Sequence, residues 1–266
     1  MKYQVISLSE KYPNLGENAC VECYIPDLFT NADPLFNQRN WPVIVVCPGG
    51  GYMNTSDREA EPIALQFTAE HYRVFVVRYS VKPIGFPQQL REVAAVMELL
   101  HENAEAWHID TQKIAIMGFS AGGHLAAQYS NRWNCPEVRE IFSNSKKAAA
   151  SILCYPVITA DPQYAHAGSI ENYNGTGASC EELVTEQTPP TFLWHTADDA
   201  VVPVENSLLY AKALSAHKVP YELHIYPHGT HGLATADEPT IVYMDPWIEQ
   251  VHSWLEEAKR WLKLVL

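Results

Sequence analysis

The feature that most constrains the fold of this chain is a single serine enclosed by glycines in "IAIMGFSAGGHLAAQYS", residues 114–130. An apolar run precedes this serine, Ser120, and a helix-like run follows it. In a sharp turn from a strand into a helix, side chains two residues before and after the tip would collide with neighbouring chain, and Gly118 and Gly122 stand there. The stretch therefore predicts a strand–turn–helix that lifts the Ser120 hydroxyl above the edge of a sheet.

The rest of the chain alternates short apolar runs with longer helical patterns, which is typical of βα units on a mostly parallel sheet. The runs "YQVISL" and "ACVECYI" predict an antiparallel hairpin near the N-terminus, and the β-branched run "VIVVC" predicts a strand buried on both faces. We expect further strands at 74–80, 113–118, 149–156, 191–195 and 221–227, and helices at 57–70, 87–106, 121–131, 204–217 and 246–264. This order predicts an α/β fold with helices on both faces of the sheet.

Two local features of this pattern are specific enough to test. Ser56 followed by Glu59 is a capping-box pattern, so we expect Ser56 to cap the helix at 57–70. The segment 157–188 fits no strong period and is longer than an ordinary connection, so we expect a lid-like insertion. Within it, Tyr164 and Tyr173 either stack on a sugar ring or hold the loop together.

Composition limits the kind of protein. With 266 residues, 47% of them hydrophobic, the chain can bury a sizeable core, and we expect residues 1–266 to form one domain. The net charge of −13, from 31 acidic and 18 basic residues, should repel phosphate backbones and disfavours nucleic acid as a partner. No stretch reaches the roughly 18 apolar residues of a membrane span, and no secretory signal is visible, so we expect a cytoplasmic protein.

The six cysteines predict free thiols, because disulfides are rare in a protein without a secretory signal. Cys20 and Cys23 form a C-x-x-C pattern, but no second pair follows at the spacing of a zinc ribbon. Cys20 lies in an expected strand, where residues three apart face opposite sides. A metal or redox role for this pair is therefore disfavoured.

A serine hydroxyl is a weak nucleophile without a base, and that base must itself be held in place. Downstream of Ser120, "WHTADDAVVP" follows an expected strand and contains Asp198 and Asp199. "YPHGTHGL" follows the last expected strand and contains His228 and His231. These positions lie at the carboxyl ends of strands, where the sites of open α/β sheets form, in the chain order serine, acid, histidine.

A second glycine-rich stretch, "VIVVCPGGGY", agrees with this chemistry. Three glycines after an early strand let the backbone approach a substrate closely with its N–H groups turned inward. The stretch corresponds to the H-G-G-G oxyanion loop of esterases, with Pro48 where histidine usually stands. No G-K-[ST] follows the glycines, which excludes a P-loop.

Taken together, these stretches resemble the α/β-hydrolase superfamily, in particular its acetyl esterase and acetylxylan-esterase-like branch. The matching stretches are "CPGGGY", "SDREAEPIA", "RYSV", "GFSAGGHLA", "FLWHTADDAVVPVENS" and "GTHGLA", in the family's order between about residues 43 and 235. The combination covers most of the chain. It is more specific for the fold than for the substrate.

The resemblance assigns roles residue by residue. It implies that Ser120 is the nucleophile and that His231 is the general base, with His228 as the alternative. The family's acid stands four residues before the proline of D-x-x-V-P, which is Asp199 here, with Asp198 as the competitor. The backbone N–H groups of Gly50, Gly51 and Ala121 match the oxyanion donors. No cofactor is implied.

Other candidate residues have simpler interpretations. Tyr52, beside the glycines, either lines the acyl pocket or packs in the core, and we treat it as a candidate substrate-binding residue. His124 and His195 are expected to pack inside the fold. The H-x-x-H pattern of His228 and His231 lacks a third ligand, so no metal is expected.

The resemblance implies a serine carboxylic-ester hydrolase that acts on short acyl esters, especially acetyl groups on sugars or xylo-oligosaccharides. Feruloyl or aryl ester hydrolysis, formamide hydrolysis and peptidase activity remain alternatives on the same fold. A binding protein on a silent hydrolase scaffold is the non-enzyme alternative. The sequence leaves the oligomeric state open, and a homodimer through the N-terminal hairpin and the closing helix is one arrangement.

Overall fold

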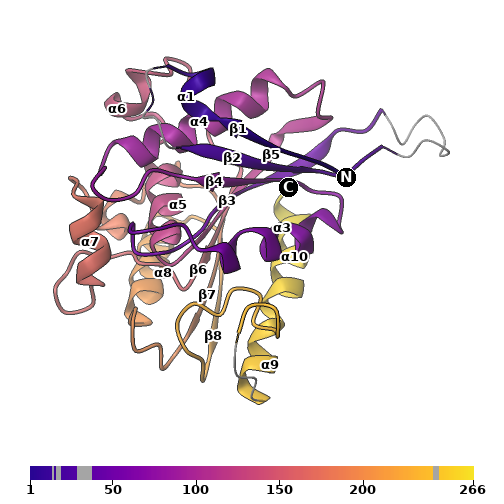
Figure 1. Ribbon diagram of the computed structural model, residues 1–266. Coiled ribbons are helices and arrows are strands. Elements are labelled where there is room, and N and C mark those ends of the chain that lie inside the picture. The colour runs from indigo at the N-terminus through magenta and orange to yellow at the C-terminus, as the bar shows by residue number, and fades with distance from the viewer. Residues whose placement is uncertain (14, 16–18, 29–37, 242–245) are drawn as a thin grey trace.

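The computed structural model describes residues 1–13, 15, 19–28, 38–241 and 246–266. In this part of the chain, one eight-stranded sheet has the order β1-β2-β4-β3-β5-β6-β7-β8 (Figure 1). Its strands are β1 (Lys2–Ser7), β2 (Cys20–Ile25), β3 (Trp41–Cys47), β4 (Arg73–Arg78), β5 (Ile109–Phe119), β6 (Ala150–Cys154), β7 (Thr191–Thr196) and β8 (Tyr221–Tyr226).

The sheet is antiparallel at one side and parallel through the rest. β1 pairs with β2 and β2 with β4 in antiparallel register, so the expected N-terminal hairpin is confirmed. From β4 through β3 to β8, every neighbouring pair is parallel. Parallel strands end at the same edge of a sheet, so the loops that follow β3, β5, β6, β7 and β8 meet there.

Helices cover both faces of this sheet (Figure 1). They are α1 (Leu8–Lys11), α3 (Glu61–Thr68), α4 (Gln88–Glu102), α5 (Ala121–Arg132), α6 (Pro136–Arg139), α7 (Ala167–Tyr173), α8 (Glu205–Ala216), α9 (Pro246–His252) and α10 (Trp254–Val265), with short 3-10 turns η1 (Asp57–Glu59) and η2 (Cys180–Leu183). Alternate residues of β3 point to opposite faces: Val45 belongs to the core cluster that includes residues of α4, α5 and α8, whereas Ile44 belongs to the cluster that includes residues of α3, α9 and α10. The all-apolar strand thus supplies both cores.

Two sequence expectations need correction. The helix expected at 57–70 is divided into η1 and α3, and Ser56 makes no side-chain capping bond. The capping-box prediction was wrong because Glu59 turns into the interior, where its carboxylate accepts hydrogen bonds from Gly49 and Tyr155. The closing helix is also divided, into α9 and α10, with Ser253 between them.

The insertion at 157–188 is more ordered than its sequence indicated. It contains α7 and η2, and it is tied to α5 because the His124 ring donates to Ala178 O and the Gln128 amide donates to Gly177 O. Tyr173 is buried and its hydroxyl donates to Gln128 Oε1. Of its two interpretations, holding the segment together fits the structure.

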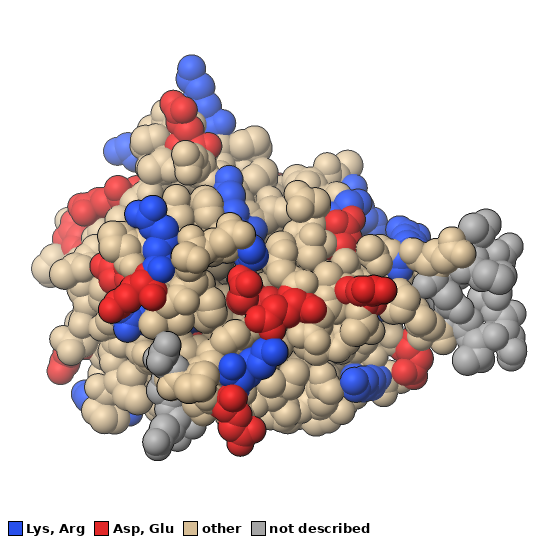
Figure 2. Space-filling model, turned by 90° about the horizontal axis from the view of Figure 1, so that it is seen from above, with Lys and Arg blue, Asp and Glu red and all other residues tan. Residues whose placement is uncertain are grey.

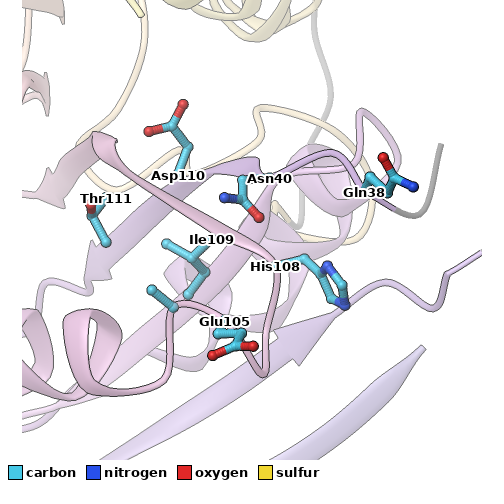
Figure 3. Close-up of a pocket in the computed structure, with 8 residues that line it drawn as sticks. Gln38, Asn40, Glu105, His108, Ile109, Asp110 and Thr111 are labelled. Atoms are coloured by element: carbon cyan, nitrogen blue, oxygen red, sulfur yellow. The ribbon is translucent and has the colours of Figure 1, made fainter. Parts of the chain in front are cut away.

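The surface and its hollows narrow the search for a site. On the face in Figure 2, basic and acidic side chains are interspersed over the molecule. A cavity of about 560 Å³ lies at the beginning of β5, beside Asn40, Ile109 and Asp110 (Figure 3). That is the amino-terminal edge of the parallel strands, away from the edge where sites of such sheets form.

Among the described helices, none is long and apolar enough to span a bilayer.

Candidate active site

Ser120 lies at the tip of the turn between β5 and α5, with an unusual positive φ of 51°. The structure gives the steric reason for the flanking glycines. A Cβ on Gly118 would approach Gly122 O to 2.2 Å, and a Cβ on Gly122 would approach Cys47 O to 2.0 Å. Any side chain at either position would therefore displace backbone, which holds the serine in its strained turn.

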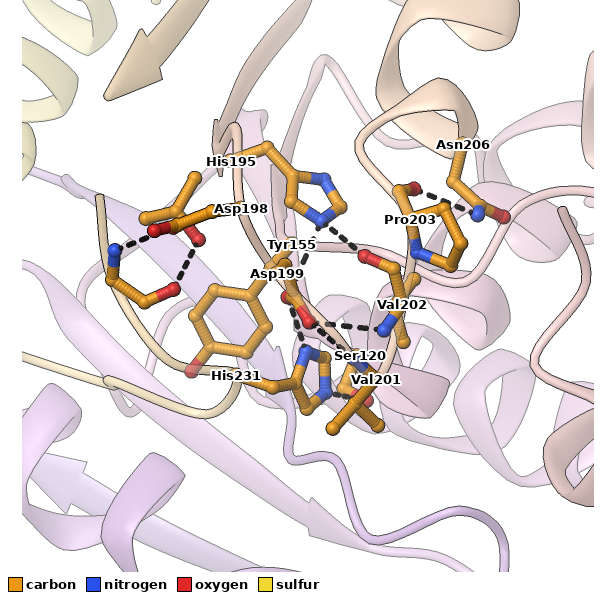
Figure 4. Close-up of polar contacts among 12 residues, drawn as sticks. Ser120, Tyr155, His195, Asp198, Asp199, Val201, Val202, Pro203, Asn206 and His231 are labelled. Carbon is orange, nitrogen blue, oxygen red and sulfur yellow. Dashed lines mark hydrogen bonds and ion pairs between the residues drawn. The ribbon is translucent and has the colours of Figure 1, made fainter. Parts of the chain in front are cut away.

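Three side chains predicted to act together lie within hydrogen-bond distance (Figure 4). The Ser120 Oγ is 2.7 Å from His231 Nε2, and His231 Nδ1 is 2.6 Å from Asp199 Oδ2. Ser120 and Asp199 are buried, whereas the His231 side chain keeps 15% of its surface exposed. The arrangement allows a proton to pass from the hydroxyl to the imidazole while the carboxylate orients the ring.

The Asp199 carboxylate is held on several sides. Its Oδ1 accepts hydrogen bonds from the backbone N–H groups of Val201 and Val202, both at 2.9 Å. His195, at the end of β7, places Nε2 3.4 Å from Asp199 Oδ2 and 3.0 Å from the carbonyl of Val202. Burial acts to raise the pKa of Asp199, but the bonds from His195 and His231 outweigh it and hold this pKa below its usual range. The group is therefore a fixed anion at neutral pH.

The competing residues form a separate pair. His228 Nδ1 lies 2.9 Å from Asp198 Oδ2, and the Gly229 N–H donates to Asp198 Oδ1 at 2.9 Å. Both side chains are about half exposed. The structure places His231, and not His228, at hydrogen-bond distance from Ser120.

The glycine loop after β3 runs beside Ser120. Glu59 Oε2 accepts the Gly49 N–H at 2.7 Å, which turns that amide toward the interior. Gly50 and Gly51 adopt φ values of 124° and 62°, a region that favours glycine. Among the described residues, no acceptor is bound to the N–H groups of Gly50, Gly51 or Ala121. These three amides are the ones expected to bind an oxyanion.

A cavity of about 380 Å³ opens over Ser120. The two loop glycines, His231, Val201 and His166 contribute to its walls. Four further wall residues are polar or charged, namely Asn54, Ser56, Arg58 and Glu59. A wall with so many hydrogen-bonding groups suits an oxygen-rich ligand better than a long acyl chain.

Tyr52 is not among the described residues that line this cavity. Its side chain is fully buried, and its hydroxyl lies 2.8 Å from Nδ1 of the equally buried His124. The His124 Nε2 donates to the carbonyl of Ala178 in the insertion. Tyr52 and His124 therefore join the glycine loop, α5 and the insertion, and the packing interpretation of Tyr52 fits its position.

Tyr155 was not singled out from the sequence, and Glu59 was predicted only as part of a capping box. Tyr155, after β6, donates its hydroxyl to Glu59 Oε1 at 2.8 Å and accepts the Ala234 N–H at 2.9 Å. Its ring packs edge-on against His231, with ring centroids 5.1 Å apart. Burial raises the pKa of Glu59, opposed by its bonds from Tyr155 and Gly49. This network connects the glycine loop with the His231 loop across the sheet edge.

The described residues also bear on metal binding and on the cysteines. Among the described residues, no cluster of three or more His, Cys, Asp or Glu side chains could hold a metal ion. The six cysteines, all in the described part, carry free thiols. Cys23 is buried whereas Cys20 is partly exposed, as expected for strand positions three apart.

The chain is similar to known esterase and xylanase sequences. The family model BD-FAE matches residues 29–154. The chain is 35% identical to the endo-1,4-beta-xylanase B of Butyrivibrio fibrisolvens over 81% of its own length and 36% of that protein. It is 32% identical to the acetylxylan esterase of Xylanibacter ruminicola over 71% of its own length and 40% of that protein. The chain thus spans well under half of these relatives.

Solved structures match over nearly the whole chain. A carboxylesterase from Lactobacillus plantarum is 30% identical, with a TM-score of 0.86 over 99% of this chain and 97% of the other. An acetyl ester-xyloside bifunctional hydrolase from Caldicellulosiruptor lactoaceticus is 34% identical, with a TM-score of 0.77 over 96% of both chains.

Proposed function

Because the chain belongs to the α/β-hydrolase esterases, a family of serine ester hydrolases, we propose that Ser120, His231 and Asp199 are its catalytic triad. The observation that carries this proposal is the continuous pair of hydrogen bonds from Ser120 through His231 to Asp199, at 2.7 and 2.6 Å. A hydrolase scaffold that had lost catalysis would have no reason to keep this alignment. We propose that residues 1–266 act as one catalytic domain, since a single sheet carries all three residues.

The reaction follows from this geometry. The Ser120 Oγ attacks the ester carbonyl carbon while His231 Nε2 takes the hydroxyl proton. The tetrahedral intermediate collapses, the alcohol leaves with the proton from His231, and an acyl-serine remains. Water then attacks the acyl-serine, with His231 again as the base. Asp199 keeps the proton of His231 on Nδ1 and stabilises the imidazolium.

The developing negative charge on the carbonyl oxygen needs donors that are already in position. We propose that the N–H groups of Ala121 and of Gly50 or Gly51 supply them. Ala121 begins α5, so its N–H is one of the helix amides without an intrahelical acceptor. Gly49 is ruled out of this role because its N–H is bound to Glu59.

For the substrate, we propose short acyl esters, above all acetyl groups on sugars or xylo-oligosaccharides. Two relatives are named for acetylxylan or acetyl-ester and xyloside hydrolysis. The polar wall formed by Asn54, Ser56 and Arg58 suits a hydroxyl-rich alcohol. Feruloyl esters would need room for a large aromatic acyl group.

The test is hydrolysis of p-nitrophenyl esters from C2 to C12 by the wild type and by Ser120→Ala. We expect a steep preference for C2 and a loss of kcat on the order of 10⁶ in the variant. The matched control is Ser130→Ala, ten residues further along α5, where the buried hydroxyl has no hydrogen-bond partner. Activity that survives in Ser120→Ala, or a wild type inactive on every ester, would overturn the proposal.

A further inference from the structure

His166 contributes a wall of the cavity over Ser120, although no motif in the sequence marks it. It comes from the insertion at 157–188 and stands at the N-cap position of α7. Its ring is partly buried. The ring therefore lies between the insertion and the site, and its chemistry depends on which ring nitrogen carries the proton.

The hydrogen bonds of His166 settle that question. Its Nδ1 accepts the backbone N–H of Ser169 at 3.2 Å, and the Ser169 hydroxyl lies 2.7 Å from the same nitrogen. A backbone amide can only donate, so Nδ1 carries no proton. A ring without a proton on Nδ1 is neutral, and burial together with the nearby His231 lowers the pKa of His166 in the same sense, against an opposing effect of Asp199. The single ring proton is therefore on Nε2.

The position of this donor is fixed by α7. The Asn172 side chain of α7 donates to the carbonyl of Gly51 at 2.9 Å, and the buried Ser169 packs beside the same glycine. Ser169 in turn holds Nδ1 of His166. Among the described residues, His166 Nε2 has no hydrogen-bond partner. A histidine that lines a ligand-sized cavity thus carries a ring N–H donor without an acceptor.

We propose that His166 is a specificity-determining residue whose Nε2–H donates a hydrogen bond to a hydroxyl or ring oxygen in the alcohol half of the substrate. This inference rests on the proposed esterase function. The carbonyl oxygen of the ester is bound by the amides of Gly51 or Gly50 and Ala121, and an acetyl group has no other oxygen. The acceptor that remains for His166 belongs to the alcohol, and a sugar provides several.

Two substitutions separate the donor from the cap. In His166→Asn, the amide oxygen takes the place of Nδ1 and still accepts the Ser169 N–H, but the Nε2–H donor is lost. In His166→Gln, the amide nitrogen takes the place of Nε2 and can still donate, but the capping acceptor is lost. If His166 acts as a donor, His166→Asn should lose more activity on a sugar ester than His166→Gln. If His166 is only a helix cap, His166→Gln should lose more.

The readout is the ratio of kcat/KM for acetylated xylobiose to kcat/KM for p-nitrophenyl acetate, whose alcohol has no sugar oxygens. We expect this ratio to fall about 10- to 100-fold in His166→Asn and to stay within a few-fold of the wild type in His166→Gln. His217→Asn, at the exposed end of α8, is the matched control and should leave the ratio unchanged.

Several outcomes would overturn the inference. An unchanged ratio in His166→Asn, or a larger loss in His166→Gln than in His166→Asn, would reduce His166 to a helix cap. A wild type that hydrolyses p-nitrophenyl acetate but not acetylated xylobiose would remove the sugar acceptor and leave the esterase intact. A wild type that hydrolyses neither ester would overturn the proposed function itself.

Discussion

Two histidine–aspartate pairs lie on the loops after β7 and β8. They consist of the same residue types but differ in their burial, in the distance between the two side chains and in their contact with Ser120. Asp198 pairs with His228 and Asp199 pairs with His231. The two aspartates are adjacent in the chain, and the two histidines are three residues apart. The first pair is 2.9 Å apart with about half of each side chain exposed. The second is 2.6 Å apart, with Asp199 fully buried and His231 15% exposed.

The difference shows that the surroundings, and not the residue types, decide what a pair can do. Once the histidine is protonated, opposite unit charges 4 Å apart interact by about 1 kcal/mol in water and by about 4 kcal/mol at an effective dielectric constant of about 20. The exposed pair is therefore worth little. Asp199 is also held by the amides of Val201 and Val202, and its histidine reaches Ser120. Asp198 accepts a single backbone N–H from another residue, that of Gly229, and its histidine does not contact Ser120.

The sharpest test of this comparison is the same substitution in both pairs. Asp199→Asn should lower kcat by about 10⁴, because an asparagine amide that donates to His231 leaves the imidazole in the wrong tautomer. Asp198→Asn should change kcat by no more than about threefold, since its partner does not contact Ser120. Steady-state hydrolysis of p-nitrophenyl acetate measures both variants.

Both substitutions conserve size, so circular dichroism and the midpoint of thermal unfolding should show folded protein in each case. A greater loss of kcat in Asp198→Asn than in Asp199→Asn would reverse the assignment of the acid. Equal losses in the two variants would mean that the pairs act as one unit.

The features predicted well from the sequence depend on neighbours along the chain. β3 was recognisable because five consecutive apolar residues, Val43 to Cys47, must be buried on both faces of a sheet. The turn at Ser120 was recognisable because its glycines are required by a steric conflict within a few residues of the serine or with the adjacent strand end. Local periodicity and steric exclusion are both written in the sequence.

The features that were missed depend on contacts between distant residues. Glu59 and Tyr155 are 96 residues apart in the chain, and their hydrogen bond forms only after β3 and β6 join one sheet. That bond draws Glu59 inward and explains why the capping box with Ser56 did not form. His166 likewise gained its place through α7, which docks on Gly51. No periodicity or motif in a single sequence signals such pairings.

The buried hydrogen bonds of Glu59 with Gly49 and Tyr155 offer a second contrast with the exposed pair of Asp198 and His228. In Glu59→Gln, one of the two donors from Gly49 and Tyr155 would face the amide NH₂ instead of an acceptor. We expect the glycine loop to shift and kcat to fall about 10- to 100-fold, less than for complete loss of an oxyanion donor, which costs about 10² to 10³. Steady-state kinetics on p-nitrophenyl acetate would measure the change.

The matched control for this prediction is Glu61→Gln, two residues away on the exposed side of α3. It makes the same change from carboxyl to amide without touching the glycine loop, so kcat should stay within about twofold. If Glu59→Gln retained full kcat, the network would serve stability alone. If Glu61→Gln lost as much, the effect would be one of general charge and not of position.

The last prediction concerns stability and not turnover, and it extends the contrast to a buried histidine outside the triad. Burial lowers the pKa of His124 to about 4, from an ordinary value near 6.5. Between these two values the unfolded chain binds a proton that the folded protein excludes, so the free energy of unfolding falls as pH falls. The loss is about 3 kcal/mol in total, at about 1.4 kcal/mol per pH unit. It is absent above pH 6.5.

Urea unfolding of the wild type and His124→Gln between pH 7 and pH 4 would measure this contribution. Other titrating groups, including Asp199, contribute equally to both proteins and cancel in the difference. We expect the wild type to be the more stable protein at pH 7, because glutamine cannot reproduce both bonds to Tyr52 and Ala178, and to lose its advantage by about pH 4. If the free energies of unfolding of the two proteins changed in parallel across this range, His124 would bind a proton as readily in the folded protein as in the unfolded chain. Burial would then not lower its pKa.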